Sequence, residues 1–235
     1  MIDFKKIYGK NKSKINFSKK FKSKRKTKKK TKKREKVKNY IFGYGSIINT
    51  NSRNYTKENI LGKSIPVILK KNAGYKRNWV TLENSKHGKF SFLGISKSKV
   101  NANDINGIIF QINKKDIKNF DKRENPDYYR RKIDLKYFKH YFNIPLPKNI
   151  NIYTYVIKKK FVNNNKCPIL QTYLDIVIQG CLEFNDKFAK MFLDTTDNWK
   201  PIYNDRKNKI YSSFNKNIKL NYKQIDNVLK NTKCF

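Results

Sequence analysis

The chain has 235 residues and a formal net charge of +39, from 56 Lys and Arg residues against 17 Asp and Glu residues. This length is enough for one domain with a substantial core and a tail, and the charge favours anionic partners. No apolar run approaches the roughly 18 residues that a membrane-spanning helix needs, and the basic N-terminus lacks the apolar stretch of a secretory signal. The sequence therefore predicts neither a membrane span nor a secretory leader.

The cysteines and histidines are too few and too scattered for a cross-linked or metal-bound fold. Cys167, Cys181 and Cys234 share no short spacing, which argues against a disulfide framework and against a zinc site. His87 and His140 are the only histidines, too few for a histidine-built metal site. We therefore expect no metal site and no disulfide, and a location in the cytoplasm or another reducing compartment.

Residues 1–38 concentrate the positive charge, with 19 of the Lys and Arg residues and 2 of the Asp and Glu residues. Because like charges repel and few apolar groups are available to bury, we expect a disordered Lys-rich tail. Its densest run, Lys19–Lys30, could bind nucleic acid or another polyanion, or direct the protein to a nucleus. A solvated tail with no dedicated partner explains the composition equally well, since Lys, Asn, Ile and Tyr are abundant throughout the chain.

A folded domain is predicted over residues 39–215, with a partly helical C-terminal extension at 216–235. Seven segments show the alternation or the apolar density of β-strands. They are Tyr40–Gly43, Ser64–Lys70, Gly74–Val80, Phe90–Ser96, Ile105–Ile112, Tyr128–Tyr137 and Ile150–Ile157. The apolar density of Ile105–Ile112 suggests a central place in the sheet, and Asn49–Arg53, rich in Asn and Ser, predicts a turn.

Helical periodicity is found in four further segments. They are Lys114–Asp121, Pro168–Phe184, Asn185–Leu193 and a C-terminal stretch around Ile225–Leu229. Pro168 suits the first turn of its helix. Pro126 prevents continuation of the first helix and favours an extended Asn125, so Glu124 is expected just past a helix end. Several strands and then helices, without strict alternation, predict an α+β fold.

Two stretches, Tyr40–Ser46 and Phe120–Arg131, together resemble the motifs of the γ-glutamylcyclotransferase family. The first ends in Gly-Tyr-Gly-Ser, like the family's Tyr-Gly-Ser loop after its first strand. The second contains Asp-Lys-Arg-Glu-Asn-Pro-Asp-Tyr-Tyr-Arg, like the family's acidic segment after a short helix. Ile47 and Ile48 are similar to the aliphatic pair of the ChaC-type and bacterial branches. The resemblance implies a small, mixed, barrel-like β-sheet packed with a few helices.

The resemblance also implies a reaction, the cyclisation of a γ-glutamyl amide to 5-oxoproline with release of an amine or a peptide. The α-amine of the substrate is the nucleophile, so the protein must fold the substrate, stabilise an oxyanion and move a proton. This chemistry requires no metal and no cofactor. The substrate could be glutathione, a γ-glutamyl amino acid, a γ-glutamylamine, or a γ-glutamyl group on a larger molecule.

Residue roles follow from the matching positions. Glu124 corresponds to the family's general acid/base, and we expect burial to raise its pKa so that it can both take and give a proton near neutrality. We expect the adjacent Arg123 to point away from it. The resemblance implies that the γ-glutamyl group would be held by a loop of six residues, which are Phe42, Gly43, Tyr44, Gly45, Ser46 and Ile47. Within that loop we expect Gly45 to be the least tolerant of a side chain.

Four weaker matches complete the comparison. Arg53 is similar to an arginine of part of the family, where it could hold a substrate carboxylate or be a surface residue. Tyr173 lies in a segment like the family's late helix, whose tyrosine hydroxyl reaches the site, although a core aromatic is equally compatible with its position. Gly74–Arg77 resembles a structural turn, and Asn204–Arg206 resembles a tail motif for which we have no chemical role.

Other functions fit the sequence less well. A serine hydrolase built on Ser46 lacks the G-x-S-x-G elbow, and a phosphate-binding loop lacks the required lysine and hydroxyl spacing. The main alternative is a catalytically inactive member of the fold that binds nucleic acid or an acidic partner through its basic residues. A departure from the family supports keeping this alternative, because Asn125-Pro126-Asp127 stands where relatives usually have glycine.

Overall fold

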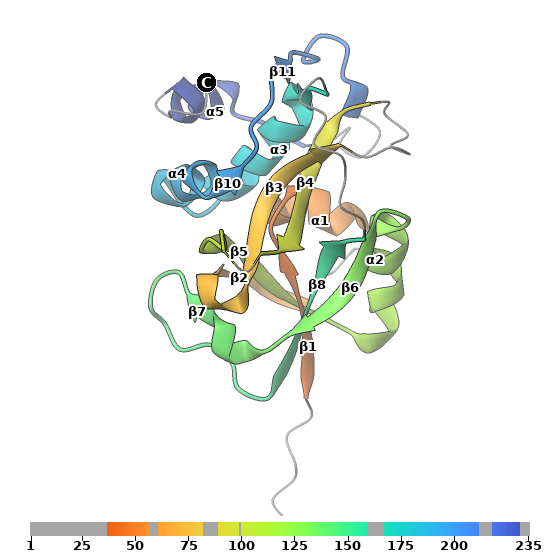
Figure 1. The fold of residues 1–235 in the computed structure, drawn as a ribbon, viewed down its shortest axis with the longest axis vertical. Coiled ribbons are helices and arrows are strands. Elements are labelled where there is room, and N and C mark those ends of the chain that lie inside the picture. Colours follow the sequence, from red (N-terminus) through yellow and green to blue (C-terminus); the bar gives the residue numbers. More distant parts are fainter. Residues whose placement is uncertain are drawn as a thin grey trace, which may run out of the picture. The chain divides into compact units, whose positions relative to one another are not determined.

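The computed structural model describes residues 37–56, 61–81, 89–98, 100–158, 167–211 and 218–230. The predicted disordered tail therefore falls outside the described residues, except for Val37 and Lys38. His87 and Cys234 fall outside them as well. Within them, the chain forms an α+β fold in which two curled sheets and a set of helices share one core (Figure 1).

The larger sheet has six strands in the order β6-β8-β1-β5-β2-β7. Their bounds are β1 Lys38–Gly43, β2 Leu61–Leu69, β5 Ile105–Ile112, β6 Tyr128–Ile133, β7 Phe138–His140 and β8 Ile150–Ile157. β1 pairs antiparallel with β5 and parallel with β8, so its C-terminal end at Gly43 emerges from the middle of the sheet. The predicted central place of β5 is confirmed, because it lies between β1 and β2.

The smaller sheet has five strands in the order β10-β3-β4-β9-β11. Its long pair is β3 (Tyr75–Thr81) with β4 (Ser91–Lys97), and three two-residue strands extend it: β9 (Ile169–Leu170), β10 (Thr196–Asp197) and β11 (Ile202–Tyr203). β4 packs against β8 and β3 against β5, which closes the two sheets into the barrel-like arrangement that was predicted.

Five helices occur in the described part of the chain. They are α1 Thr50–Thr56, α2 Ile117–Glu124, α3 Gln171–Leu182, α4 Asp186–Asp194 and α5 Tyr222–Lys230, with short 3-10 turns at η1 Ser46–Ile48, η2 Lys71–Ala73, η3 Lys114–Asp116 and η4 Leu135–Tyr137. α3 is the most buried and packs against η1, α4 and α5. The predicted C-terminal helix is confirmed by α5, which buries Ile225 and Leu229.

Four predicted boundaries were wrong. The helix predicted over Lys114–Asp121 continues to Glu124, so Glu124 is its last residue and does not lie past its end. Asn49–Arg53 is not a turn but the start of α1, because the Asn49 side chain accepts a hydrogen bond from Ser52 N at 2.9 Å and acts as a cap. Pro168 is not in the first helical turn, because Ile169 and Leu170 form β9 before α3 begins. The strand predicted over Tyr128–Tyr137 ends at Ile133, where Asp134 caps the 3-10 turn η4.

Large apolar side chains fill the core from both sheets and from α3 and α4. Trp79, Phe42, Phe110, Phe120 and Phe192 are fully buried. Cys167 and Cys181 are free thiols in the described part of the chain, and burial raises the pKa of Cys181 to about 12. No described helix is long and apolar enough to cross a bilayer.

Candidate active site

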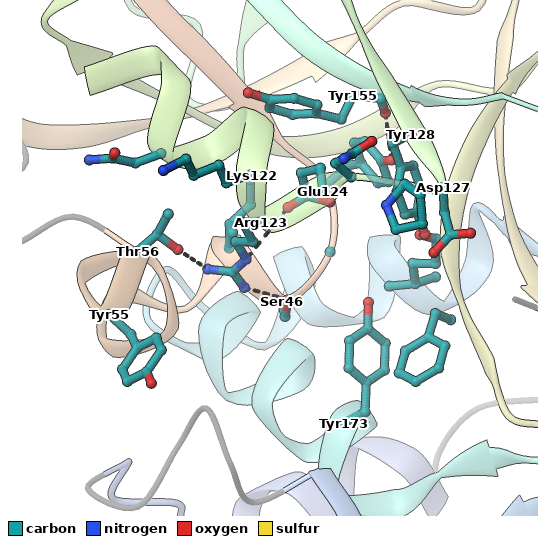
Figure 2. Close-up of a pocket in the computed structure, with 18 of the residues that line it drawn as sticks. Ser46, Tyr55, Thr56, Lys122, Arg123, Glu124, Asp127, Tyr128, Tyr155 and Tyr173 are labelled. Atoms are coloured by element: carbon teal, nitrogen blue, oxygen red, sulfur yellow. Dashed lines mark hydrogen bonds and ion pairs between the residues drawn. The ribbon is translucent and has the colours of Figure 1, made fainter. Parts of the chain in front are cut away.

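A pocket of about 590 Å³ opens where the end of β1 meets the end of α2 (Figure 2). Its walls come from η1 and α1, from β4, from α2 and the turn after it, and from β6, β8 and α3. The lining residues are Phe42, Tyr44, Gly45, Ser46, Ile47, Tyr55, Thr56, Phe92, Leu93, Asn119, Lys122, Arg123, Glu124, Asn125, Pro126, Asp127, Tyr128, Tyr155, Tyr173 and Tyr211. Segments that are distant in sequence therefore meet at one cavity.

Glu124 is the last residue of α2 and faces this pocket (Figure 2). The chain leaves the helix at once, because Asn125 is extended, with φ −75° and ψ 144°, as expected of a residue before proline. Only 19% of the Glu124 side chain is exposed. Burial raises the pKa of Glu124 above its ordinary value, and the nearby Arg123 guanidinium opposes this rise.

The prediction that Arg123 points away from Glu124 was wrong. Its Nε lies 3.5 Å from Glu124 Oε1, while its other nitrogens donate to Ser46 Oγ at 3.1 Å and to Ser52 O at 2.8 Å. It also donates to Thr56 Oγ1 and Ser52 Oγ. The reason is the position of α1, whose polar groups face α2 and engage all sides of the guanidinium. Arg123 therefore fixes the glutamate relative to the serine loop, and both of its terminal nitrogens donate to protein oxygens.

The Gly45–Ser46 loop forms the opposite wall. Gly45 precedes the 3-10 turn η1, and Ile48 N donates to Gly45 O at 2.9 Å. The first N–H groups of a helical turn have no partner within it, so the N–H groups of Ser46 and Ile47 are not used by hydrogen bonds inside η1. A methyl group on Gly45 would lie 3.3 Å from the Tyr173 hydroxyl. The loop and the α3 tyrosine are thus in close contact across the pocket.

Buried tyrosines supply most of the remaining wall. Tyr44 OH donates to Tyr155 O at 2.6 Å, and Tyr128 OH donates to Leu93 O at 2.7 Å. Burial raises the pKa of Tyr44, Tyr128 and Tyr173 above that of a free phenol, and the charge of Glu124 adds to the rise. These phenols stay protonated at neutral pH and serve as neutral hydrogen-bonding groups around the carboxylate.

The structure brings together most of the residues named from the sequence. Phe42, Tyr44, Gly45, Ser46, Ile47, Glu124 and Tyr173 all line the pocket. Gly43 does not. A Cβ at Gly43 would lie 2.6 Å from Ile47 Cγ1, so this glycine allows the chain to turn beneath the loop rather than contact a ligand. Gly43 is accordingly less tolerant of a side chain than Gly45, contrary to the expectation for the loop.

Arg53 does not reach the pocket and is not a surface residue. It is 4% exposed, and its guanidinium donates to Ile47 O at 2.9 Å and to Ile48 O at 2.8 Å. Burial lowers its pKa to about 10. The predicted contact between Arg53 and a substrate carboxylate is therefore not supported, since this side chain holds the carbonyl groups of η1 from behind.

A second buried arginine, Arg77 on β3, supports the loop from the core. Its guanidinium donates to Asn106 O at 2.8 Å, to Phe192 O at 3.0 Å and, more weakly, to Tyr44 O at 3.4 Å. Asn106 Oδ1, Thr195 Oγ1 and Thr196 Oγ1 accept its remaining hydrogen bonds. Burial lowers its pKa to about 9. The structural role expected for Gly74–Arg77 agrees with this set of contacts.

Several pocket residues were missed in the sequence. Tyr211 is the clearest, because it follows the last short strand in a polar stretch with no periodic pattern. Its ring lies 4.9 Å from that of Tyr173, and hydrogen bonds from Ser46 and Arg123 partly offset the rise in its pKa that burial causes. Asp127 and Tyr128 lie three and four residues after Glu124, so their place in the pocket could have been predicted from the sequence.

The comparison with solved structures indicates the fold. A structure described as γ-glutamyl cyclotransferase is similar over 82% of this chain and 98% of that chain, with a TM-score of 0.52 and 13% sequence identity. The chain has a γ-glutamyl cyclotransferase-like fold. The uncharacterised protein loc79017 from Homo sapiens is similar over 65% of this chain and 87% of that chain, with a TM-score of 0.48 and 14% identity. No protein-family model and no curated protein sequence matches the chain.

The pocket contains groups suited to acid/base chemistry on a bound ligand. It has one partly buried carboxylate with a raised pKa, a loop with backbone donors and a wall of neutral phenols. Among the described residues, no three His, Cys, Asp or Glu side chains form a group that could hold a metal ion.

Proposed function

We propose that the protein is a γ-glutamylcyclotransferase-type enzyme that converts a γ-glutamyl amide to 5-oxoproline and releases the amine or peptide. The observation that supports this most is the placement of Glu124. Its carboxylate has a raised pKa and shares a pocket of about 590 Å³ with the Gly45–Ser46 loop. A carboxylate between two reacting nitrogens needs this environment, because it must accept a proton and then return it.

In the proposed reaction the α-ammonium of the substrate first gives one proton to solvent. The resulting amine attacks the γ-carbonyl carbon, and a C–N bond forms as the carbonyl oxygen gains negative charge. The N–H groups at the start of η1 stabilise this oxygen. Glu124 takes the second proton from the attacking nitrogen and gives it to the leaving nitrogen, whose C–N bond then breaks. The released amine takes up a proton from solvent, so the overall charge balances.

Arg123 supports this role without contacting the substrate. Its contacts with Ser46 and Glu124 hold the acid/base and the loop in a fixed relation, which matters because small displacements reduce effective molarity strongly. The phenols of Tyr44 and Tyr173 line the pocket in protonated form and can hydrogen-bond the polar groups of a folded substrate.

The test is release of 5-oxoproline from a panel of γ-glutamyl peptides, amino acids and amines by the full-length protein. We expect Glu124→Gln to lower kcat by about 10²- to 10⁴-fold, the usual contribution of general acid/base catalysis. Asp116→Asn is the matched control, because Asp116 precedes the same helix and lies outside the pocket lining. Equal, background-level release by wild type and Glu124→Gln would exclude the proposed reaction for those substrates.

A further inference from the structure

Two tyrosines from separate segments form one wall of the pocket. Tyr173 lies in α3, and Tyr211 lies at the end of the segment after β11. Their ring centroids are 4.9 Å apart at an interplanar angle of 84°, and the Phe92 ring lies 5.1 Å from that of Tyr173. Both tyrosines are under 8% exposed. An edge-to-face pair of this kind has a defined geometry, so moving either backbone would reshape the wall.

A single carboxylate connects the backbones beside these two rings. Asp205 Oδ1 accepts from Thr172 N at 2.8 Å, and Asp205 Oδ2 accepts from Thr172 Oγ1 and from Ile210 N at 3.0 Å. Thr172 directly precedes Tyr173, and Ile210 directly precedes Tyr211. Thr172 also contributes one of the first N–H groups of α3, where a negative charge is favourable. Asp205 is 2% exposed, so these hydrogen bonds are shielded from water.

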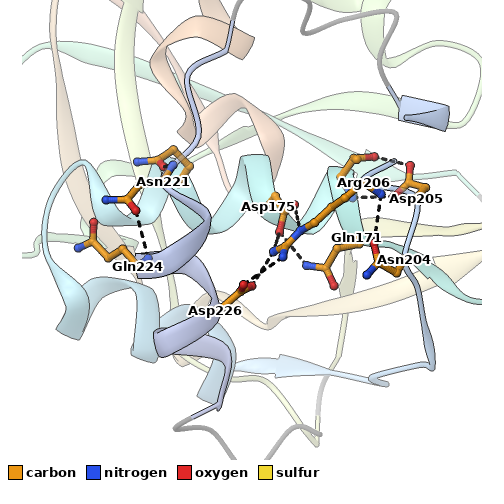
Figure 3. Close-up of polar contacts among 10 residues, drawn as sticks. Gln171, Asp175, Asn204, Asp205, Arg206, Asn221, Gln224 and Asp226 are labelled. Carbon is orange, nitrogen blue, oxygen red and sulfur yellow. Dashed lines mark hydrogen bonds and ion pairs between the residues drawn. The ribbon is translucent and has the colours of Figure 1, made fainter. Parts of the chain in front are cut away.

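Arg206, the residue after Asp205, binds two other carboxylates. Arg206 donates to Asp175 Oδ2 and Oδ1, both at 2.8 Å, and to Asp226 Oδ1 at 2.6 Å (Figure 3). Asp175 lies in α3 and Asp226 in α5, so this arginine joins two helices. Its contacts do not involve the backbone next to either pocket tyrosine. The two neighbouring residues thus have separable roles.

We propose that Asp205 is a positioning residue that holds Tyr173 and Tyr211 in place as a wall of the substrate pocket, a role that rests on the function proposed above. It acts through those rings and does not contact the substrate. The same placement sets where the Tyr211 hydroxyl meets Ser46 and Arg123. The Asn204-Asp205-Arg206 segment, which had no chemical role in the sequence, is thereby connected to the site.

The test compares Asp205→Asn with Asp226→Asn in the full-length protein. In Asp205→Asn, an NH₂ group replaces one carboxylate oxygen, so it faces an N–H donor of Thr172 or Ile210 and that hydrogen bond is lost. The volume of the side chain stays nearly the same. We expect KM for the best γ-glutamyl substrate to rise about tenfold with a smaller change in kcat, the pattern of lost uniform binding. Asp226 is 40% exposed and touches only Arg206 among the contacts described, so its variant should keep the wild-type KM.

A second readout does not depend on catalysis. Acetylation of tyrosines by N-acetylimidazole, mapped by mass spectrometry, should increase at Tyr173 and Tyr211 in Asp205→Asn and remain at the wild-type level in Asp226→Asn. Thr172→Val, which removes only the hydroxyl contact, replaces Asp205→Asn if that variant does not fold. Increased labelling in a protein that releases no 5-oxoproline would retain the positioning role and reject the proposed reaction. Unchanged labelling with unchanged KM would overturn the positioning role.

Discussion

Two opposing effects set the proton affinity of Glu124. Burial raises its pKa, and the Arg123 guanidinium 3.5 Å away lowers it. The first effect prevails, which leaves the folded pKa above the ordinary value of 4.5. A carboxylate with a raised pKa is a stronger base than an exposed one, and its acid form persists to higher pH. Substitution of Arg123 should therefore change the pKa of Glu124.

The pH dependence of kcat/KM tests this balance. Glu124 must be ionised to take a proton, so activity should fall as pH decreases through its folded pKa. Replacing Arg123 with Ala removes the opposing charge and should move this acidic limb to higher pH, whereas Arg123→Lys keeps the charge and should leave it closer to wild type. The measurement is kcat/KM from pH 4 to 9. A limb that stays in place or moves to lower pH in Arg123→Ala would contradict the assignment to Glu124.

Individual residues were predictable where a short motif fixed the backbone. The Gly45–Ser46 loop follows the first strand as its motif implied, whereas Glu124 is the last residue of α2 and not the residue past the helix end that Pro126 had suggested. Side-chain direction was not predictable, because Arg123 faces groups of α1, a helix that was expected to be a turn. Tyr211 was missed because it lies in a polar stretch without periodicity, and only the fold brings its ring within 4.9 Å of the Tyr173 ring.

Among the structural elements, α3 approaches the residue that follows η1 so closely that side-chain size is limited there. A Cβ on Gly180 of α3 would lie 2.4 Å from Asn49 N, a backbone atom that no rotamer change can move. Glycine is required here by the close approach of a helix to the loop that forms the pocket wall. Gly45, by comparison, is limited by the tip of one side chain and by Leu93.

Alanine at these two glycines should separate stability from activity. Gly180→Ala should lower the free energy of unfolding by about 2 kcal/mol, because overpacking costs about 1–3 kcal/mol and a backbone clash is at its upper end. The gain in helix propensity, at most about 1 kcal/mol, does not offset this cost. Gly45→Ala should change stability by less than about 1 kcal/mol but lower kcat/KM about tenfold. Urea unfolding and the product assay measure both, and greater destabilisation by Gly45→Ala would refute this order.

Long elements were predicted better than short ones. β5 and β8 were predicted with their observed bounds, and β2, β3 and β4 differ from prediction by three residues at most, because each strand has a clear apolar pattern. α1 was missed because its sequence, Thr-Asn-Ser-Arg-Asn-Tyr-Thr, has no apolar stripe and depends on the Asn49 cap and on Glu183 of the α3 end. The two-residue strands β9, β10 and β11 are too short to show any period.

At the scale of the whole molecule, the fold class could be predicted from the sequence, but the order of the strands in the sheet could not. The α+β class and the barrel-like sheet were predicted from element order and from the family resemblance. The pairing of β1 with both β5 and β8 could not be predicted, since strand neighbours depend on packing between distant segments. The boundary at residue 38, the partners and the cellular location stay predictions.

We propose that residues 1–38 bind nucleic acid or another polyanion. With 19 of the Lys and Arg residues in this segment, binding should weaken steeply between about 50 and 200 mM salt and be lost when the chain begins at Asn39. Fluorescence anisotropy with DNA and RNA oligonucleotides measures both effects, and the shortened protein should release 5-oxoproline at the same rate as the full-length protein if the proposed function holds. Binding that survives both the deletion and high salt would reject an electrostatic anchor.

The buried guanidinium of Arg77 has one consequence for the cavity above it. In the part of the chain that the structure describes, the acceptors of its hydrogen bonds are carbonyl, amide and hydroxyl oxygens and not carboxylates. A pKa of about 9 keeps it cationic at neutral pH. The charge of Asp197 helps to keep the guanidinium protonated without accepting a hydrogen bond from it, and a buried charge acts over a longer range than one in water. The peptide unit joining Tyr44 to Gly45 therefore lies in a positive electrostatic potential, which favours an oxygen that becomes anionic beside that peptide.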